Sequence, residues 1–80
     1  MKTADEMFSE LGYKKMPKCD GVYEAGIQHP SKRFVRIDIS RNSVYKELVF
    51  PAGSTHTEPF TPSEILACAQ FIKEMEENIG

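Results

Sequence analysis

Apolar residues near the start of the chain recur at the spacing of one helical face. The four residues at positions i, i+3, i+4 and i+7 are Ala4, Met7, Phe8 and Leu11. Thr3 stands just before them and Glu6 follows three residues later, which is the pattern of a capping box at a helix N-terminus. Gly12 comes directly after the last apolar residue, where helices commonly end in a left-handed conformation. The pattern predicts a helix over residues 4–11.

The end of the chain carries a second and longer helical pattern. Thr61 suits the N-cap, Pro62 the first helical position and Glu64 the third. We expect the helix to run from Pro62 to about residue 78. Its expected buried face consists of Ile65, Cys68, Ala69, Ile72, Met75 and Ile79, with Leu66 and Phe71 at its flanks.

Between these helices the pattern changes to the alternation that is typical of strands. Residues 34–39 show it most clearly, and residues 22–27 and 44–50 are predicted to form two further strands. Residues 13–21 and 51–60 contain proline and glycine, so we expect a polar linker and a loop there.

The second and third strands can be aligned through the tight turn between them. If Ser40 faces Ser43, the opposed pairs are Phe34–Val49, Val35–Leu48, Arg36–Glu47, Ile37–Lys46 and Ile39–Val44. One face of this hairpin is then mainly apolar, as a half-buried sheet requires. Lys46 is the exception on that face, and we expect it to lie near a sheet edge with its amino group in water. On the opposite face, Arg36 and Glu47 are expected to form a charge pair.

The first strand has a more apolar face formed by Tyr23, Ala25 and Ile27. Aligning this face with the apolar face of the second strand needs either an odd-length loop or a bulge. Gly26 would supply the bulge. The order of elements, α-β-β-β-α, predicts an α+β fold: a three-stranded antiparallel meander with two helices packed on one face. We expect residues 1–80 to form a single small domain.

The composition favours a soluble protein, since 40 % of the residues are hydrophobic and 28 % are charged. No apolar run approaches the length that spans a membrane. Acidic residues follow Met1 closely, where a signal peptide requires an apolar stretch, so we expect a cytoplasmic location. Cys19 and Cys68 form no C-x-x-C pair and are expected to be free thiols, with Cys68 in the core and Cys19 exposed.

The chain lacks the sequence patterns that usually indicate enzyme chemistry. The two histidines, His29 and His56, are expected in loops, and no nucleophile signature adjoins them. The cysteines and histidines are not spaced like zinc ligands, and the five isolated glycines form no phosphate-binding loop. The sequence therefore predicts a non-enzymatic protein with no cofactor and no metal.

Charge is spread unevenly along the chain and indicates a candidate interaction surface. The net charge of -2 resolves into zero over residues 1–21, +2 over residues 22–50 and -4 over residues 51–80. The candidate surface consists of Lys32, Arg33, Phe34, Arg36, Arg41 and Tyr45. Three of these residues are expected in or beside the hairpin loops (Lys32, Arg33 and Arg41), and the other three on the open face of the sheet. Basic residues interleaved with aromatic ones on an open sheet can bind single-stranded nucleic acid.

The acidic end of the chain comes mainly from the last helix. We expect Glu74, Glu76 and Glu77 to form a solvated face of that helix. They lie near its C-terminus, where the helix dipole disfavours negative charge.

The opening K-T-A-D-E-M-F-S-E-L-G-Y, residues 2–13, resembles the start of a set of short, uncharacterised proteins from Gram-positive bacteria and their phages. Those proteins open with K-T-A-D-E-M-F-x-E-L-G-Y and continue through three strands to a capped final helix. The segment Glu58-Pro59-Phe60-Thr61, with Glu64 and Leu66, loosely matches that ending, whereas Ser63 and Ala67-Cys68-Ala69 depart from it. The resemblance implies a phage or prophage accessory protein and supplies no catalytic residues.

The order of elements also resembles that of double-stranded-RNA-binding domains. In that family a loop after the first strand places a histidine in the minor groove, and a basic cluster opens the last helix. The segment Gln28-His29-Pro30, with Arg33-Phe34, is faintly similar to the first feature, but Pro62-Ser63-Glu64 contains no basic residue. An acidic helix start repels phosphate, and a shared order of elements does not establish a function.

Three hypotheses about function follow from the sequence. The leading one is a non-enzymatic phage-type accessory protein that binds another protein, whose identity the sequence does not give. The alternative is a weak nucleic-acid-binding module that uses the sheet face and the hairpin loops. The third is a homodimer in which the open face, with Phe34, Tyr45 and Val49, is buried against a second copy. No membrane partner is expected.

Overall fold

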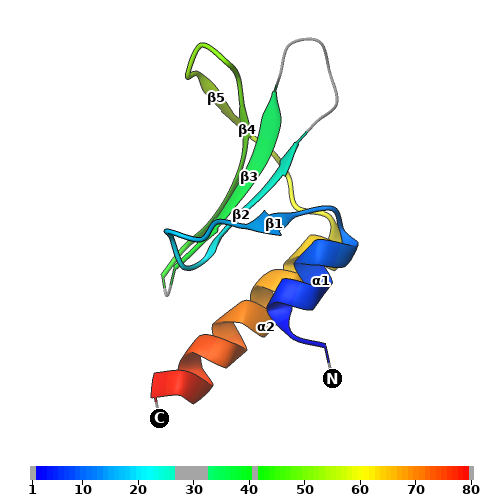
Figure 1. The fold of residues 1–80 in the computed structure, drawn as a ribbon, viewed down its shortest axis with the longest axis vertical. Helices are drawn as coiled ribbons and strands as arrows, with labels where there is room; N and C mark the ends of the chain where they lie inside the picture. Colours follow the sequence, from blue (N-terminus) through cyan, green and yellow to red (C-terminus); the bar gives the residue numbers. More distant parts are fainter. Residues whose placement is uncertain (1, 27–32, 41, 80) are drawn as a thin grey trace.

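The computed structural model describes residues 2–26, 33–40 and 42–79. The elements are α1 (Ala4–Glu10), β1 (Lys14–Lys15), β2 (Val22–Gly26), β3 (Phe34–Ile39), β4 (Val44–Val49), β5 (Thr55–Thr57) and α2 (Pro62–Ile79). The strands form one antiparallel sheet in the order β1-β2-β3-β4-β5. Figure 1 shows the two helices together beside one half of the sheet, while the β4–β5 hairpin projects beyond them. Among the described residues, no helix is both long and apolar enough to cross a membrane.

The predicted α+β fold is confirmed, but the prediction of three strands is wrong because the sheet has five. β1 lies in the segment predicted as a linker, and β5 lies in the segment predicted as a loop. Every residue of these two strands is exposed. Strands of two or three exposed residues need no apolar alternation, so the hydrophobic pattern carries no sign of them.

The register predicted for the β3–β4 hairpin is confirmed at every proposed pair, from Phe34 opposite Val49 to Ile39 opposite Val44. β2 pairs with β3 in an unbroken ladder that ends with Gly26 opposite Phe34, so the suggested bulge at Gly26 is absent. The odd-length loop is the alternative that holds, since seven residues, 27–33, separate Gly26 from its partner Phe34. The pairing of Tyr23 with Ile37 places the apolar sides of both strands on one face, and the predicted contribution of Ile27 lies outside the described residues.

Both helices cover that apolar face and share one core with it. The buried core residues are Ala4 and Phe8 of α1, Tyr13, Tyr23, Ile37 and Ile39 of the sheet side, and Ala67 and Cys68 of α2. Phe8 stacks on Tyr23 with the ring centroids 4.0 Å apart, and Phe71 meets Tyr23 edge-on at 6.0 Å. Tyr23 therefore joins the sheet to both helices.

The first helix begins as the sequence predicts. The Thr3 side chain accepts a hydrogen bond from the Glu6 backbone, and the Glu6 carboxylate accepts one from the Thr3 backbone, which completes the capping box. The helix ends at Glu10, one residue earlier than predicted, with Leu11 as its C-cap. Gly12 follows with a φ of 91°, the left-handed conformation expected for that position.

Two carboxylates hold α1 in place from other parts of the fold. The hydroxyl of Tyr23 donates to Asp5 of α1. Glu74 of α2 accepts a 2.8 Å hydrogen bond from the backbone N–H of Ala4 and another of 2.8 Å from the side chain of Gln70. The prediction that Glu74 lies on a solvated face is therefore wrong: it satisfies a backbone donor at the start of α1 that the helix itself leaves unpaired.

The second helix spans Pro62–Ile79 as predicted, but its buried face is turned from the predicted one. The buried residues are Glu64, Ala67 and Cys68, whereas Ala69 is exposed and the side chain of Ile65 is 55 % exposed. The reason is that α1 packs beside α2, so α2 buries the side that faces both α1 and the sheet. Sequence periodicity alone centres the face on the largest apolar side chains and overlooks Ala67.

A close backbone approach occurs where the chain enters β2. Gly21 has a φ of 85°, and its backbone oxygen accepts a 2.8 Å hydrogen bond from the N–H of Ile39. A Cβ atom at this position would overlap the backbone oxygen of Ile39. Glycine is therefore required here both for its positive φ and for the absence of a side chain.

Candidate interaction surfaces

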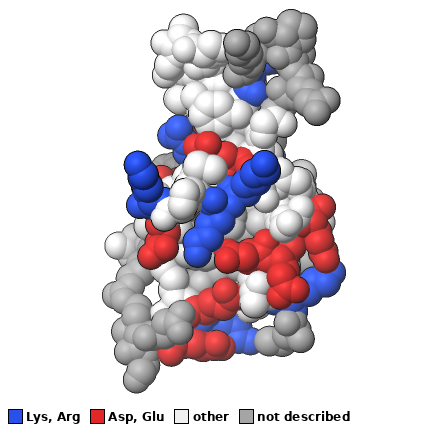
Figure 2. Space-filling view, in the orientation of Figure 1, with Lys and Arg blue, Asp and Glu red and all other residues white. Residues whose placement is uncertain are grey.

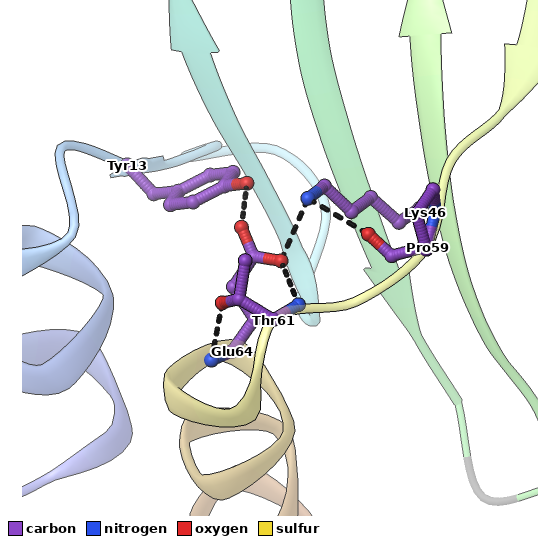
Figure 3. Close-up of polar contacts among 5 residues, drawn as sticks. All are labelled: Tyr13, Lys46, Pro59, Thr61 and Glu64. Carbon is purple, nitrogen blue, oxygen red and sulfur yellow. Dashed lines mark hydrogen bonds and ion pairs between the residues drawn. The ribbon is translucent and has the colours of Figure 1, made fainter.

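A buried polar cluster lies where the start of α2 meets the sheet (Figure 3). The Nζ of Lys46 lies 2.7 Å from Oε1 of Glu64, and the Lys46 and Glu64 side chains are only 12 % and 7 % exposed. The Tyr13 hydroxyl donates to Oε2 of Glu64 at 2.6 Å. The Thr61 backbone donates to Oε1 at 2.9 Å, and the Glu64 backbone donates to the Thr61 hydroxyl at 3.2 Å. Lys46 also donates to the Pro59 oxygen at 3.0 Å.

The expectation that Lys46 extends into water at a sheet edge is wrong. β4 has a partner strand on each side, and the side chain of Lys46 reaches Glu64 in the first turn of α2. The amino group therefore lies inside the protein, where a charge needs a partner. Glu64 provides that partner from α2, while it also caps the helix at the position that the sequence predicts.

The ionisation of this cluster favours a fixed structural role. Burial raises the pKa of Glu64, but the hydrogen bonds from Lys46, Tyr13 and Thr61 outweigh it, so the pKa lies below its ordinary value. Burial, followed by the bond to Glu64, raises the pKa of Tyr13. Burial, with the charge of Glu64, raises the pKa of the nearby Cys68 thiol to about 11. The carboxylate stays charged, and the phenol and thiol stay protonated near pH 7, which suits mutual bonding rather than nucleophilic chemistry.

The structure brings together three of the six residues of the predicted interaction surface. Phe34, Arg36 and Tyr45 occupy the sheet face opposite the helices. Phe34 and Arg36 alternate along β3 with the residues that face the helices, and Tyr45 lies opposite Asp38, which is on the same face as Arg36. The guanidinium of Arg36 lies over the ring of Phe34, 5.5 Å from its centroid. Tyr45 is 56 % exposed.

Of the remaining three predicted residues, the structure describes Arg33, which contacts a different aromatic ring. The guanidinium of Arg33 lies 5.8 Å from the ring centroid of Phe50, at the projecting end of the sheet. Lys32 and Arg41 lie outside the described residues.

Charges of alternating sign cross the open face of the sheet. In register, Lys14 lies beside Glu24, Glu24 beside Arg36, and Arg36 beside Glu47. The predicted ion pair between Arg36 and Glu47 is wrong, since Arg36 bonds instead to Glu24 of β2 at 3.2 Å. Arg36 thus has a carboxylate on both neighbouring strands, and the positive charge that it presents to a phosphate is reduced.

An apolar groove lies on the other side of the molecule, between α2 and β4. It has a volume of about 240 Å³ and is lined by Val44, Phe60, Ile65, Cys68, Ala69 and Ile72. The sequence places most of these residues in the core, so it gives no sign of a groove. They line one because α2 turns Ala67 and Cys68 inward and leaves Ile65 and Ala69 at the surface.

A second hollow lies between α1 and α2. It is lined by Lys2, Met7, Glu10, Leu11, Ser63 and Leu66. Leu66 is 63 % exposed and Leu11 is 38 % exposed. Lys2 and Glu10 form an ion pair at its rim, with Nζ and Oε1 2.6 Å apart, so this hollow is more polar than the groove.

The helical half of the molecule is acidic. Apart from the buried Glu64, the two helices contain six acidic residues and one lysine: Asp5, Glu6, Glu10, Glu74, Glu76, Glu77 and Lys73. Figure 2 shows acidic side chains gathered over this half, whereas the end formed by the β4–β5 hairpin is largely uncharged.

Comparison with known proteins gives no assignment beyond this geometry. The chain has no significant match to a protein-family model, to a curated protein or to a solved structure.

Proposed function

We propose that the chain is a small protein-binding module and that the groove between α2 and β4 receives its partner. The observation that carries the proposal is the apolar lining of this groove together with the exposure of Ile65 at 55 %. Fully burying a side chain of this size contributes roughly 1.5–3 kcal/mol, so burying the exposed part of Ile65 would contribute about half of that. A concave, mainly apolar surface is a common form of binding site.

The groove is present in the chain without a partner. One wall is α2, and the opposite wall includes Val44 of β4 and Phe60 of the segment before α2. The bond between Lys46 and Glu64 joins β4 to the start of α2 and so sets the distance between the walls. Pre-formed sites avoid the entropic cost of ordering at the moment of binding.

The groove offers apolar contact and shape rather than chemistry. Its polar neighbours, Lys46 and Glu64, bond to one another, and Cys68 keeps its proton. The groove therefore suits the apolar side chains of a partner. The resemblance of residues 2–13 to phage and prophage proteins makes a Gram-positive host lysate the natural source of partners.

The proposal is tested by comparing two neighbouring substitutions on α2. Ile65→Asp places a charge in the groove, whereas Leu66→Asp makes the same kind of change in the hollow beside α1. Each chain would be immobilised and used to capture proteins from the lysate, with quantitative mass spectrometry as the readout. We expect Ile65→Asp to reduce the recovery of specific partners by about tenfold or more, and Leu66→Asp to leave it within about twofold.

Folding of both variants is verified first by circular dichroism and thermal melting. Equal recovery with the wild type and Ile65→Asp would contradict the proposal. Loss with Leu66→Asp alone would assign binding to the hollow between the helices and would also reject the groove. Recovery of no specific protein by the wild type would remove the support for a protein-binding role.

A further inference from the structure

We infer that the groove between α2 and β4 selects an amphipathic helix with basic residues at one end. This inference rests on the proposed function and specifies the chemistry of the partner. It follows from the shape of the groove along α2 and from the position of the acidic residues at one end of it.

The apolar wall of the groove has the repeat of a helical face. Ile65, Ala69 and Ile72 lie at positions i, i+4 and i+7 of α2, and together they extend about 10 Å along the helix. The small side chain of Ala69 lies between the two larger ones and leaves room for a bulky side chain of a partner. A second helix presents such side chains at the same repeat, which is the usual way in which helices bind in apolar grooves.

Acidic residues lie at the end of the groove near the C-terminus of α2. Glu76 lies four residues beyond Ile72, on the same side of α2, and Glu77 is its exposed neighbour. The last turn of α2 contains no basic residue, so the negative end of the helix dipole adds to these charges. Lys73 reduces the negative charge by one unit. At the opposite end, the carboxylate of Glu64 is already paired with Lys46.

Charge also argues against other occupants. A second copy of this chain would bring another acidic helical half against the first, and like charges disfavour that contact. An acidic peptide meets the same repulsion from Glu76 and Glu77. A partner with lysine or arginine near this end gains attraction instead, and its apolar side chains are buried in the groove.

The inference is tested with synthetic peptides and the isotope-labelled full chain. The probe is a peptide of about 14 residues composed of leucine and lysine in a helical repeat. One control has the same composition in an order without helical periodicity, and a second control carries glutamate in place of lysine. We expect NMR shift changes to centre on Ile65, Ala69 and Ile72, with binding about tenfold tighter than for either control. Shift changes centred elsewhere would overturn the inference.

Two charge reversals separate local attraction from the effect of net charge. Glu76→Lys changes the end of the groove, and Asp38→Lys changes an exposed residue on the opposite side of the sheet. Both raise the net charge by the same amount. We expect Glu76→Lys to weaken binding of the leucine–lysine peptide about fivefold or more, and Asp38→Lys to weaken it less than about twofold.

Equal effects of the two reversals, or equal binding of the glutamate peptide, would overturn the inference about the partner. The proposed function has its own test, because capture of host proteins still depends on Ile65 if the partner is not basic. Capture that is lost in Ile65→Asp but retained in Glu76→Lys would therefore support the groove and reject the basic helix.

Discussion

Glu64 combines two roles that the fold brings to one side chain. As the third residue of α2 it bonds to the Thr61 backbone, and as the partner of Lys46 it neutralises a buried charge. The first role depends on residues three positions apart in sequence. The second depends on how α2 packs against β4, and it makes Glu64 the residue whose loss should affect stability most directly.

We predict that Glu64→Gln lowers the free energy of unfolding by about 3 kcal/mol at pH 7, because it leaves Lys46 buried without an opposite charge. Urea denaturation would measure the change. Glu77→Gln is the matched control, since Glu77 is exposed on the same helix, and it should change stability by less than about 0.5 kcal/mol.

The wild type and Glu64→Gln should differ in how their free energies of unfolding depend on pH. The pKa of Glu64 is lower in the folded chain than its ordinary value of 4.5. Its stabilising contribution is therefore complete above that ordinary value and is lost as the pH falls through the folded-state pKa. The difference in unfolding free energy between wild type and Glu64→Gln should shrink as the solution is acidified below about pH 4.5. A difference that stays constant down to pH 3 would contradict this assignment.

Gly21 provides a second prediction at the scale of single residues. Gly21→Ala combines an unfavourable positive φ with an overlap against the Ile39 backbone, and we expect a loss of about 3 kcal/mol in unfolding free energy. Gly53→Ala is the matched control, because Gly53 has a φ of 93° but open space around it, and it should cost only about 1 kcal/mol. Equal losses in thermal or urea unfolding would show that the close approach at Gly21 is unimportant.

At the scale of elements, local patterns predict much of the structure. Both helix starts follow from capping residues within three positions, and the register of the β3–β4 hairpin follows from its short turn. The short edge strands and the buried side of α2 do not follow from such patterns. They depend on which element lies next to which, and the groove is missed for the same reason.

The contact between α1 and α2 gives a prediction at this scale. Glu74→Ala removes the hydrogen bond acceptor for the Ala4 backbone, and we expect α1 to be destabilised by about 1 kcal/mol, as for the loss of a helix cap. Amide hydrogen exchange should become faster across α1 while the β3–β4 hairpin is unaffected. Glu76→Ala, two residues further along α2, should leave exchange in α1 unchanged. Unchanged exchange in Glu74→Ala would contradict the role of Glu74.

At the scale of the whole molecule, the distribution of charge favours a protein partner over a nucleic acid. The helical half is acidic, and the open sheet face alternates in sign around Arg36. The alternative proposal of a weak nucleic-acid binder keeps Phe34, Arg36 and Tyr45 as its site. Titration of labelled single strands at low salt, with Arg36→Ala as the comparison, decides between the two proposals.

The sequential order of the strands has a consequence for how the chain folds. Each strand pairs with a neighbour in sequence, so the sheet can form through short loop closures that cost little entropy. The contact between α1 and α2 instead joins the two ends of the chain and requires the longest closure. We expect the meander to form early and the helices to dock late. Stopped-flow folding and unfolding of Glu74→Ala should then show a faster unfolding rate and an unchanged folding rate.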